Sequence, residues 1–458
     1  MDTVLNKNQK IHFIGIGGIS MSSLAQILLT RGIPVTGSDF KDSELVKELR
    51  EMGADIAIGH SAANVHEDTS LVVYTAAIKE DNPELVRARE LKIPAVTRAE
   101  FLGQLMKDYD TAICVSGTHG KTTTTSIISQ ILLDGDTDPT IMVGGILPSI
   151  GGNTRIGHSG NFITEACEYT NSFLSFFPTV EVVLNVKEDH LDFFKDLDDI
   201  RKSFRTYTHL LPDDGTLVIN GEIEGLNYFT DGLNCRVITY GLDGDYEYTA
   251  RNCTYNNVAC GEYDLYRNGE FVCHVALKIP GEHNISNSLA AFAAAEAIGI
   301  DAAKAASSIS SFEGVDRRFQ YKGTIGGVTV VDDYAHHPDE ISATINAALK
   351  CPHEKLVVVF QPHTYSRTKA LMDGFAESLS AADLVILADI YAAREKDNLG
   401  ISSKDLQEKI LARGCECLYF PTFDEIENYL LENLEAGDMV ITMGAGDVVN
   451  IADDLTGK

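Results

Sequence analysis

Short hydrophobic runs alternate with helical patterns along most of the chain. Residues 11–14 form an apolar run typical of a buried strand, and residues 20–31 place apolar side chains at the i, i+3, i+4 and i+7 spacing of a helix. Further strand-like runs begin at residues 35 and 71. Strands that alternate with helices in this way indicate βαβ units and a parallel sheet.

The same alternation begins twice more. A second series starts with the apolar run at residues 111–115, and a third starts near residue 322. Between them, residues 236–280 change to short alternating strands, and Asn268-Gly269 separates two of these in a way typical of a β-hairpin. We therefore predict an α/β protein of three domains, at residues 1–109, 110–321 and 322–458, with Rossmann-like first and third domains and additional small hairpins in the second.

Composition narrows the classes of ligand and the cellular setting. The 37 Lys and Arg residues against 67 Asp and Glu residues give a net charge of −30, so nucleic acid is repelled and an anionic ligand needs local cations and backbone amides. The chain has no run of 18 apolar residues and no secretory signal, and its nine cysteines include no Cys-x-x-Cys pair. These features predict a soluble, cytoplasmic protein with reduced thiols and no membrane partner.

A glycine-rich loop joins the first predicted strand to its helix. Gly15, Gly17 and Gly18 precede Ser20, and Asp39 ends the next strand. Glycines at this position let the backbone approach a diphosphate at a helix N-terminus, although Ser20 replaces the third glycine of the dinucleotide fingerprint. The loop predicts either NAD or a UDP-sugar as ligand, with a tight turn that binds nothing as the alternative.

A second loop, at the start of the second domain, has the features of a phosphate-binding loop. Lys121 is expected to reach the β- and γ-phosphates of ATP, and the Thr122 hydroxyl to ligate Mg²⁺. Val115 stands where the strict pattern has its first glycine, but the loop lies between a strand and a helix predicted at residues 124–133. The predicted cofactor-binding residues are Gly117, Thr118, His119, Gly120, Lys121, Thr122 and Thr123.

Two more candidate metal ligands follow in the second domain. Glu165 comes directly after the predicted strand at residues 161–164, and His190 follows the apolar run at residues 180–184. A carboxylate suits Mg²⁺, whereas an imidazole is a less usual ligand for it. The alternative is that Glu165 is a solvated strand end and His190 a structural histidine.

Basic and imidazole side chains near the third domain are candidates for anion contacts. Arg318 lies just before that domain, and His363 and Arg367 follow one of its predicted strands. In so acidic a chain an arginine at a strand end suits an anionic ligand. Helix capping or surface ion pairs are the alternative for each of these residues.

Taken together, these segments resemble the Mur ligases of bacterial peptidoglycan synthesis over essentially the whole chain. The resemblance rests on the sequences Ile-His-Phe-Ile-Gly-Ile-Gly-Gly at 11–18, Gly-Ser-Asp at 37–39, Gly-Thr-His-Gly-Lys-Thr-Thr-Thr-Thr at 117–125, Gly-Glu-His-Asn-Ile-Ser-Asn-Ser at 281–288, Arg-Arg-Phe at 317–319, Asp-Asp-Tyr-Ala-His-His-Pro at 332–338 and Phe-Gln-Pro-His-Thr-Tyr-Ser-Arg-Thr at 360–368. It is strongest to the branch of the family that adds L-alanine to UDP-N-acetylmuramate.

The resemblance implies a role for each matching residue. The first domain would bind UDP through the loop of Gly15, Gly17, Gly18 and Ser20 with Asp39, and the second would be P-loop-like. Asn284 and Asn287 would contact adenine; Thr122 and Glu165 would hold one Mg²⁺ and His190 a second. Arg318, Asp333 and Tyr334 would close on the nucleotide, and His336, His363 and Arg367 would meet the muramate end.

The implied reaction is ATP-driven amide formation through an acyl phosphate, by a monomer or homodimer. The chain departs from the family at Cys167, where an Asp is usual, and it has no lysine where sister ligases carry a carbamylated one. Because no single domain holds all the parts, we expect the third domain to close on the second about a hinge near residues 313–323.

Three other functions are compatible with parts of the sequence. A recycling ligase that attaches a tripeptide to UDP-N-acetylmuramate shares the second loop and the Ala-His-His-Pro segment, but residues 360–368 favour the alanine-adding branch. An NAD-dependent oxidoreductase accounts for the first loop alone and leaves Lys121 and Glu165 without a role. A nucleotide-gated regulatory or scaffold protein would bind ATP without catalysis.

Overall fold

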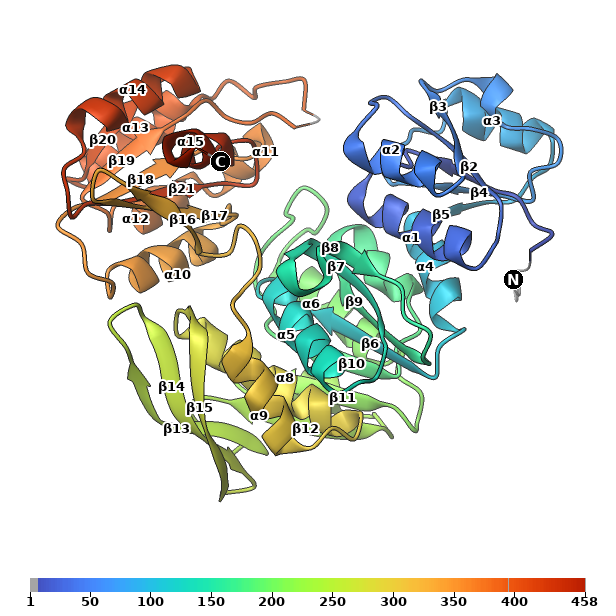
Figure 1. The fold of residues 1–458 in the computed structure, drawn as a ribbon, viewed down its shortest axis with the longest axis horizontal. Coiled ribbons are helices and arrows are strands. Elements are labelled where there is room, and N and C mark those ends of the chain that lie inside the picture. The colour runs from blue at the N-terminus through green and yellow to red at the C-terminus, as the bar shows by residue number, and fades with distance from the viewer. Residues whose placement is uncertain (1–6, 394, 458) are drawn as a thin grey trace.

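The computed structural model describes residues 7–393 and 395–457, which fold into three α/β domains, as predicted. In Figure 1 the first domain and the third lie on either side of the second, which joins them. Each domain is built on its own β-sheet. No helix within the described ranges is long and apolar enough to cross a bilayer.

The first domain holds a five-stranded parallel sheet with the order β3-β2-β1-β4-β5. The order reverses at β1, so the loop after β1 opens at the point where ligands bind in such sheets. The elements are β1 (Ile11–Ile14), α1 (Ile19–Thr30), β2 (Val35–Asp39), α2 (Glu44–Glu51), β3 (Asp55–Ile58), η1 (Ala62–Asn64), β4 (Leu71–Tyr74), α3 (Pro83–Glu90), β5 (Ala95–Thr97) and α4 (Arg98–Met106).

The second domain holds a ten-stranded sheet with the order β15-β14-β13-β12-β11-β10-β6-β9-β7-β8. Its strands and helices are β6 (Thr111–Ser116), α5 (Lys121–Asp134), β7 (Thr140–Leu147), η2 (Pro148–Ile150), β8 (Gly152–Arg155), β9 (Asn161–Ala166), η3 (Tyr169–Ser175), β10 (Val180–Val183), α6 (Leu197–Thr208), β11 (Thr216–Asn220), α7 (Asn227–Thr230), β12 (Arg236–Gly241), β13 (Tyr248–Tyr255), β14 (Cys260–Arg267), β15 (Glu270–Pro280), α8 (His283–Ala297) and α9 (Ala302–Ser311).

The predicted hairpin extends this same sheet. Asn268 and Gly269 join β14 to β15, and both have positive φ angles, 50° and 79°, as the tight turn of a hairpin requires. In Figure 1 these long strands project from the second domain beneath the third. The hairpin strands are therefore an arm of the central sheet.

The third domain holds a six-stranded sheet with the order β16-β17-β21-β18-β19-β20, parallel except for β16. Its elements are β16 (Gln320–Ile325), β17 (Val328–Asp333), α10 (Pro338–Ala348), β18 (Leu356–Phe360), α11 (Tyr365–Ala370), α12 (Met372–Leu379), β19 (Leu384–Leu387), α13 (Ser403–Ala412), β20 (Glu416–Tyr419), α14 (Phe423–Asn433), β21 (Met439–Met443) and α15 (Val449–Thr456).

Among the element boundaries that differ from the sequence-based expectation, two concern candidate site residues. Helix α5 begins at Lys121, three residues before the predicted start, because Gly120 takes a φ of 86° and turns the chain directly into the helix. Strand β9 continues to Ala166, since its pairing with β6 extends that far, so Glu165 lies within the strand and not after it. Both shifts bring the candidate side chains closer to the sheet edge.

The domains are joined in two different ways. The first shares a hydrophobic core with the second, in which Phe101 of α4 and Phe173 of η3 are both buried. The third is linked by the segment before β16, in which Gly314 has a φ angle of 108°; Gly323, the second glycine near the expected hinge, lies within β16 and pairs with Val330. This second junction is the one whose backbone suits a hinge.

Candidate functional site

Lys121 lies in a strongly anionic setting at the start of α5. Its ammonium donates hydrogen bonds to the carbonyls of Gly117 and Thr118 and to Oε2 of Glu168, at 3.0 Å. Burial disfavours its charge, but the nearby Glu168 raises the pKa of Lys121 above its ordinary value. Lys121 is therefore a fixed positive charge at the loop that the sequence assigns to phosphates.

The loop itself is clamped by an asparagine that the sequence reasoning missed. Asn185, just after β10, accepts a hydrogen bond from the His119 N–H at 2.9 Å and donates one to the His119 carbonyl at 3.0 Å. The Thr118 hydroxyl accepts from the N–H of Lys187 at 2.9 Å. The loop conformation is thus set by the neighbouring strand end.

Thr122 and Glu165 face two glycines of β7. A Cβ on Gly144 would lie 2.9 Å from Oε1 of Glu165, and one on Gly145 would lie 3.2 Å from Cγ2 of Thr122. The N–H of Gly144 donates to Oε1 of Glu165 at 2.6 Å. Glycines at these two positions leave room for both predicted metal ligands at the sheet edge.

Glu168 adds a second carboxylate to this centre. It is buried, its Oε2 accepts from Lys121, and its Oε1 has no hydrogen-bond partner within the described structure. Hydroxyl and carboxylate oxygens are the ligands that Mg²⁺ prefers, and an unpartnered buried oxygen is costly without a cation. The oxygen atoms of Thr122, Glu165 and Glu168 are therefore of the chemical types that suit a magnesium ion.

A cavity of about 260 Å³ lies between this loop and the third domain. The second domain contributes predicted nucleotide residues from its loop and from the start of α8, and the hinge segment contributes Arg318. The predicted residues that line the cavity are His119, Gly120, Thr123, Asn284, Asn287, Arg318 and Asp333. The structure brings these residues together although they are far apart in the sequence.

Asp333 and Tyr334 support the cavity from beneath. The carboxylate of Asp333 accepts from the N–H groups of Phe319 and Ala335 and from Thr344 Oγ1, at 2.7 to 3.1 Å, while burial raises its pKa to about 6. The Tyr334 ring lies 5.3 Å from the Arg318 guanidinium. In the ligand-free protein both residues therefore orient the hinge segment.

A second cleft is lined by His190, Asp189, His363 and Arg367, from the second and third domains. Arg367 Nη2 lies 3.3 Å from Oδ1 of Asp189. Burial opposes the charge of Asp189, but His190 and Arg367 hold its pKa at about 2. Burial lowers the pKa of His363 to about 4, so this imidazole is neutral near pH 7.

His336 stands apart from His190. Its Nδ1 lies 3.0 Å from the Tyr334 carbonyl, its ring is 5.9 Å from that of His363, and burial lowers its pKa to about 4. Its backbone N–H donates to Glu340 Oε2 at 3.1 Å. His336 thus lies between the two cavities.

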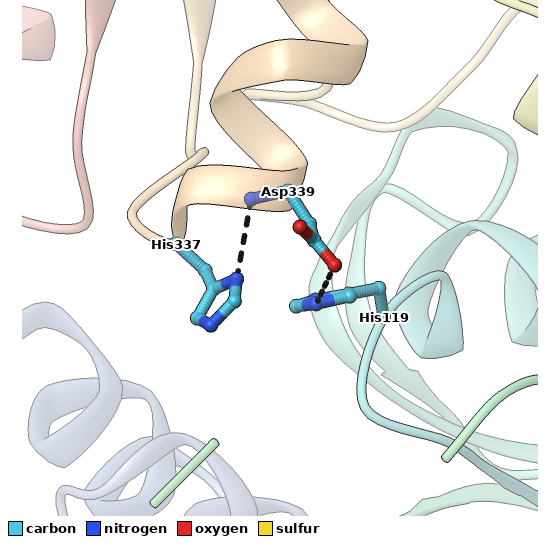
Figure 2. A group of neighbouring side chains, drawn as sticks. All are labelled: His119, His337 and Asp339. Atoms are coloured by element: carbon cyan, nitrogen blue, oxygen red, sulfur yellow. Dashed lines mark hydrogen bonds and ion pairs between the residues drawn. The ribbon is translucent and has the colours of Figure 1, made fainter. Parts of the chain in front are cut away.

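His119, His337 and Asp339 place nitrogen and oxygen atoms within 4.8 Å of one another across the domain boundary (Figure 2). Nδ1 of His337 accepts the N–H of Asp339 and caps α10. Because Nδ1 accepts this hydrogen bond, a neutral His337 ring carries its proton on Nε2, which then has no lone pair to offer a metal ion. The cluster is better explained as a contact between domains.

Neighbouring ion pairs strengthen this contact. His119 Nδ1 lies 3.3 Å from Glu340 Oε1, and Lys187 Nζ lies 2.7 Å from Asp339 Oδ2. Burial disfavours the charged form of Glu340. The pKa of Glu340 is nevertheless well below its ordinary value, because His336 and Arg318 lie near the carboxylate and His119 is hydrogen-bonded to it. The third domain is therefore already docked on the phosphate loop.

The glycine loop of the first domain has its own internal supports. Asp39 Oδ2 accepts the Gly17 N–H at 2.9 Å, and a Cβ on Gly17 would lie only 3.0 Å from that oxygen. Ser20 accepts a hydrogen bond from Nη1 of Arg98 at 3.1 Å. Asp39 thus braces the loop, and Ser20 faces an arginine that the sequence reasoning did not single out.

The other missed residues share one property. Glu168, Asp189 and Glu340 each lie within a few residues of a predicted site residue, and each is ion-paired to a residue distant in the chain. Their proximity to Glu165, His190 and His336 was the available signal. Nothing in the sequence distinguished them from solvated carboxylates.

Three family descriptions match consecutive parts of the chain. Residues 10–110 match "Mur ligase family, catalytic domain", residues 115–295 match "Mur ligase middle domain", and residues 317–446 match "Mur ligase, glutamate ligase domain". The three matches fall on the three sheets in order.

Curated proteins and solved structures match over nearly the full length. The UDP-N-acetylmuramate–L-alanine ligases of Lachnospira eligens and Agathobacter rectalis are 56% and 54% identical to this chain, over 97% and 98% of each partner. A crystal structure of UDP-N-acetylmuramate–alanine ligase from Thermotoga maritima is 31% identical, with a TM-score of 0.82 over 98% of both chains. A murein peptide ligase from Psychrobacter arcticus, at 24% identity and TM-score 0.73, shares the fold.

Proposed function

The chain belongs to the Mur ligase family, and we propose that it uses ATP to join L-alanine to the carboxylate of UDP-N-acetylmuramate. It is an ATP-dependent acid–amino-acid ligase of peptidoglycan synthesis. Full-length identity of 56% to a curated ligase with these two substrates supports the choice of L-alanine. The reaction is proposed to take place in the cytoplasm. The proposed domain boundaries of the chain are at 109/110 and 321/322.

One structural observation carries this proposal. The fixed charge of Lys121 directly follows Gly120 of the nucleotide cavity in the chain, and its ammonium donates hydrogen bonds to the phosphate loop at the Gly117 carbonyl and to the Glu168 carboxylate. An enzyme that transfers a γ-phosphoryl group needs such a cation between its two anionic reactants. An oxidoreductase needs neither the loop nor this cation.

The proposed reaction has two steps. An oxygen of the substrate carboxylate attacks the γ-phosphorus of ATP, the bond to ADP breaks, and an acyl phosphate forms. The amine nitrogen of L-alanine then attacks the acyl carbon, loses a proton, and displaces inorganic phosphate. Positioning and charge neutralisation provide most of the catalysis in such phosphoryl transfer.

The residues divide these tasks between them. Lys121 neutralises phosphate oxygens, and the loop amides from Gly117 to Thr123 hold the phosphates. Asn284, Asn287 and Arg318 line the cavity proposed for the nucleoside. Arg367 and the neutral His363 line the cleft proposed for the muramate end, where Asp189 fixes the guanidinium.

We propose that Thr122 and Glu165 hold Mg²⁺, with Glu168 close by and His190 at a second ion. A bound Mg²⁺ supplies neutralisation of the charge that builds up on the phosphoryl oxygens. Before any ion binds, the Lys121–Glu168 pair keeps the Glu168 carboxylate partly neutralised in its buried position. Cys167, whose thiol pKa is raised by burial, offers no suitable ligand to a hard cation.

Two measurements test the proposal against its alternatives. Phosphate release from MgATP should require both UDP-N-acetylmuramate and L-alanine; release with a tripeptide but not with L-alanine would identify a recycling ligase. Calorimetry should detect binding of UDP-N-acetylmuramate but not of NAD. ATP binding without any substrate-dependent phosphate release would instead indicate a regulatory or scaffold protein.

A further inference from the structure

Arg98 is a partly buried cation without a counter-charge. It forms no ion pair among the described residues, and its one hydrogen bond is to the Ser20 hydroxyl. Arg31, Arg317 and Arg367 are also partly buried, and each contacts a carboxylate, of Asp108, Asp332 and Asp189 respectively. Arg201, Arg205 and Arg318 are like Arg98 in having no ion pair among the described residues. In a chain with 67 acidic residues, a partly buried guanidinium that has no carboxylate partner calls for a physical explanation.

The position of Arg98 is fixed with respect to two domains. It is the first residue of α4, which starts at a capping box of Thr97 and Glu100. Phe101 of the same helix packs edge-on against Phe13 of β1, at 5.9 Å between ring centroids. On its other side, Gly103 lies so close to η3 that a Cβ there would be 1.9 Å from the Ser175 carbonyl oxygen.

This placement brings Arg98 near both nucleotide loops. Ser20 belongs to the first turn of α1, directly after the glycine loop. The thiol of Cys167, in the segment after β9, is close enough to feel the positive charges of both Arg98 and Lys121. Arg98 therefore contacts the glycine loop directly and lies near a residue that is itself near Lys121 of the phosphate loop.

The positive charge of a guanidinium in this position is destabilising until an anionic ligand binds beside it. Burial lowers the pKa of Arg98, which means that the surroundings disfavour its charge. A cation withdrawn from water is normally matched by a partner, and its cost is recovered when a ligand supplies that partner. The neighbouring N–H groups at the start of α1 add to the attraction for a negative group.

We propose that Arg98 binds the diphosphate of UDP-N-acetylmuramate and so directs the rest of the substrate toward Lys121. This inference rests on the proposed function, and it adds a substrate-binding residue from the helix that links the first domain to the second. The flat guanidinium matches two phosphate oxygens at once, which a lysine does not. The Ser20 hydroxyl holds the guanidinium beside the glycine loop until the substrate binds.

The diphosphate is favoured over the other anions for geometric reasons. The hydrogen-bond partner of Arg98 is on the glycine loop, where a diphosphate is expected, whereas the reacting carboxylate must approach Lys121. The phosphates of ATP are expected at the loop of Gly117 to Thr123, and Arg98 forms no hydrogen bond to that loop within the described structure. Of these three anions, the diphosphate is the one whose loop Arg98 contacts.

Three variants of the full chain test the assignment. Arg98→Met removes the charge and keeps the stem, Arg98→Lys keeps the charge without the flat fork, and Arg89→Met is the control, since Arg89 is an exposed arginine of the same domain paired with Glu80. Calorimetry with UDP-N-acetylmuramate, with UDP alone and with an ATP analogue gives affinities. Steady-state kinetics give KM for each substrate, and thermal unfolding without ligand gives stability.

For Arg98→Met we expect the affinities for UDP-N-acetylmuramate and for UDP to fall by the same factor, about 10- to 100-fold. Arg98→Lys should lose less, and Arg89→Met nothing. KM for ATP and L-alanine should stay unchanged. The ligand-free melting temperature of Arg98→Met should be equal or higher, because an uncompensated charge has been removed, whereas a purely structural role would lower it.

The opposite results would overturn the inference. If Arg98→Met bound UDP normally but UDP-N-acetylmuramate more weakly, Arg98 would contact the carboxylate end of the substrate and not the diphosphate. If the variant had a lower melting temperature and bound every ligand more weakly, the role of Arg98 would be structural. The UDP titration needs no turnover, so it separates this inference from the proposed function. Weakened UDP binding in a chain that releases no phosphate would reject the function alone.

Discussion

At the scale of single residues, the charge of each site residue is set by its neighbours. Lys121 stays protonated because Glu168 lies beside it. Asp189 stays ionised because His190 and Arg367 lie beside it. His336 and His363 are neutral because they are buried. The site therefore holds a cation at the loop proposed for the phosphates and neutral imidazoles near the cleft proposed for the muramate end.

Lys121→Ala should abolish substrate-dependent phosphate release. Loss of one such transition-state contact reduces turnover by about 10²- to 10³-fold. The variant should also be less stable, because it leaves the Glu168 carboxylate buried without its partner, an effect of about 3–5 kcal/mol. Lys121→Ala combined with Glu168→Gln should recover the stability in denaturant unfolding but not the activity. Near-normal turnover in Lys121→Ala would show that the loop is not catalytic.

Glu165→Gln and His190→Ala should raise the Mg²⁺ concentration needed for activity, or remove the activity. Each change deletes a ligand that we propose for a metal ion, whereas Cys167→Ser exchanges one neutral side chain for another and should keep most of the activity. Magnesium titrations of phosphate release compare the three variants. Equal damage from Cys167→Ser would require a new metal assignment.

Glu181 provides a pH-dependent test of burial. It lies fully buried in β10 with neither carboxylate oxygen hydrogen-bonded, and burial raises its pKa well above the ordinary value. The folded chain therefore keeps a proton that the unfolded chain releases above about pH 4.3. The contribution of Glu181 to stability is thus lost as the pH rises from there through the folded-state pKa.

Glu181→Gln should remove this dependence. The free energy of unfolding of the variant, from urea titrations, should exceed that of the unchanged chain by more near pH 8 than near pH 5. Glu48→Gln is the control, because Glu48 of α2 is exposed, and this change should alter neither value. Parallel profiles for Glu181→Gln and the unchanged chain would contradict the assignment.

At the scale of elements, α4 has a double role. It closes the first domain, and it contacts η3 of the second through a glycine with no space for a side chain. The segment after β9 also carries Cys167 and Glu168 toward Lys121 and Arg98. The relative position of the two nucleotide loops therefore depends on how closely α4 packs against η3.

Gly103→Ala should disturb this packing. The added methyl group would meet the Ser175 carbonyl at 1.9 Å, so the helix must move, and overpacking of this kind destabilises by about 1–3 kcal/mol. Gly152→Ala is the matched control, because a Cβ there meets nothing within 4 Å. Thermal unfolding compares the two, and KM for UDP-N-acetylmuramate should rise only in Gly103→Ala. Equal stability of both variants would contradict the packing argument.

At the scale of the whole molecule, the site is divided among the domains. The third domain contacts the second through His119 with Glu340, Lys187 with Asp339, and Arg367 with Asp189. Figure 1 shows the first and third domains on either side of the second. The segment that holds Gly314, before β16, is the junction at which we expect these contacts to open.

We expect an ATP analogue with UDP-N-acetylmuramate to stabilise the docked state in solution. Arg318 and Glu340 line the same cavity as the phosphate loop, so a bound nucleotide adds contacts across the boundary. Small-angle scattering should give a smaller radius of gyration with both ligands than without them. An unchanged radius would count against closure.

The Glu340→Gln variant is a comparison for the same experiment. It weakens the contact between His119 and the third domain while leaving the hinge segment in place. Its ligand-free radius should exceed that of the unchanged chain. The two radii should approach each other when both ligands are bound.

The sequence by itself determined the features that depend on contiguous residues. Hydrophobic runs predicted the strands, and the loops at Gly15 and Lys121 carry their chemistry within a few consecutive residues, so the three-domain α/β fold could be predicted. Only the tertiary structure decided which side chains meet: Arg98 with Ser20, Glu168 with Lys121, Asp189 with Arg367, and Glu340 with His119. Such partners come from different elements, and burial and packing, which no local pattern encodes, bring them together and set their charges.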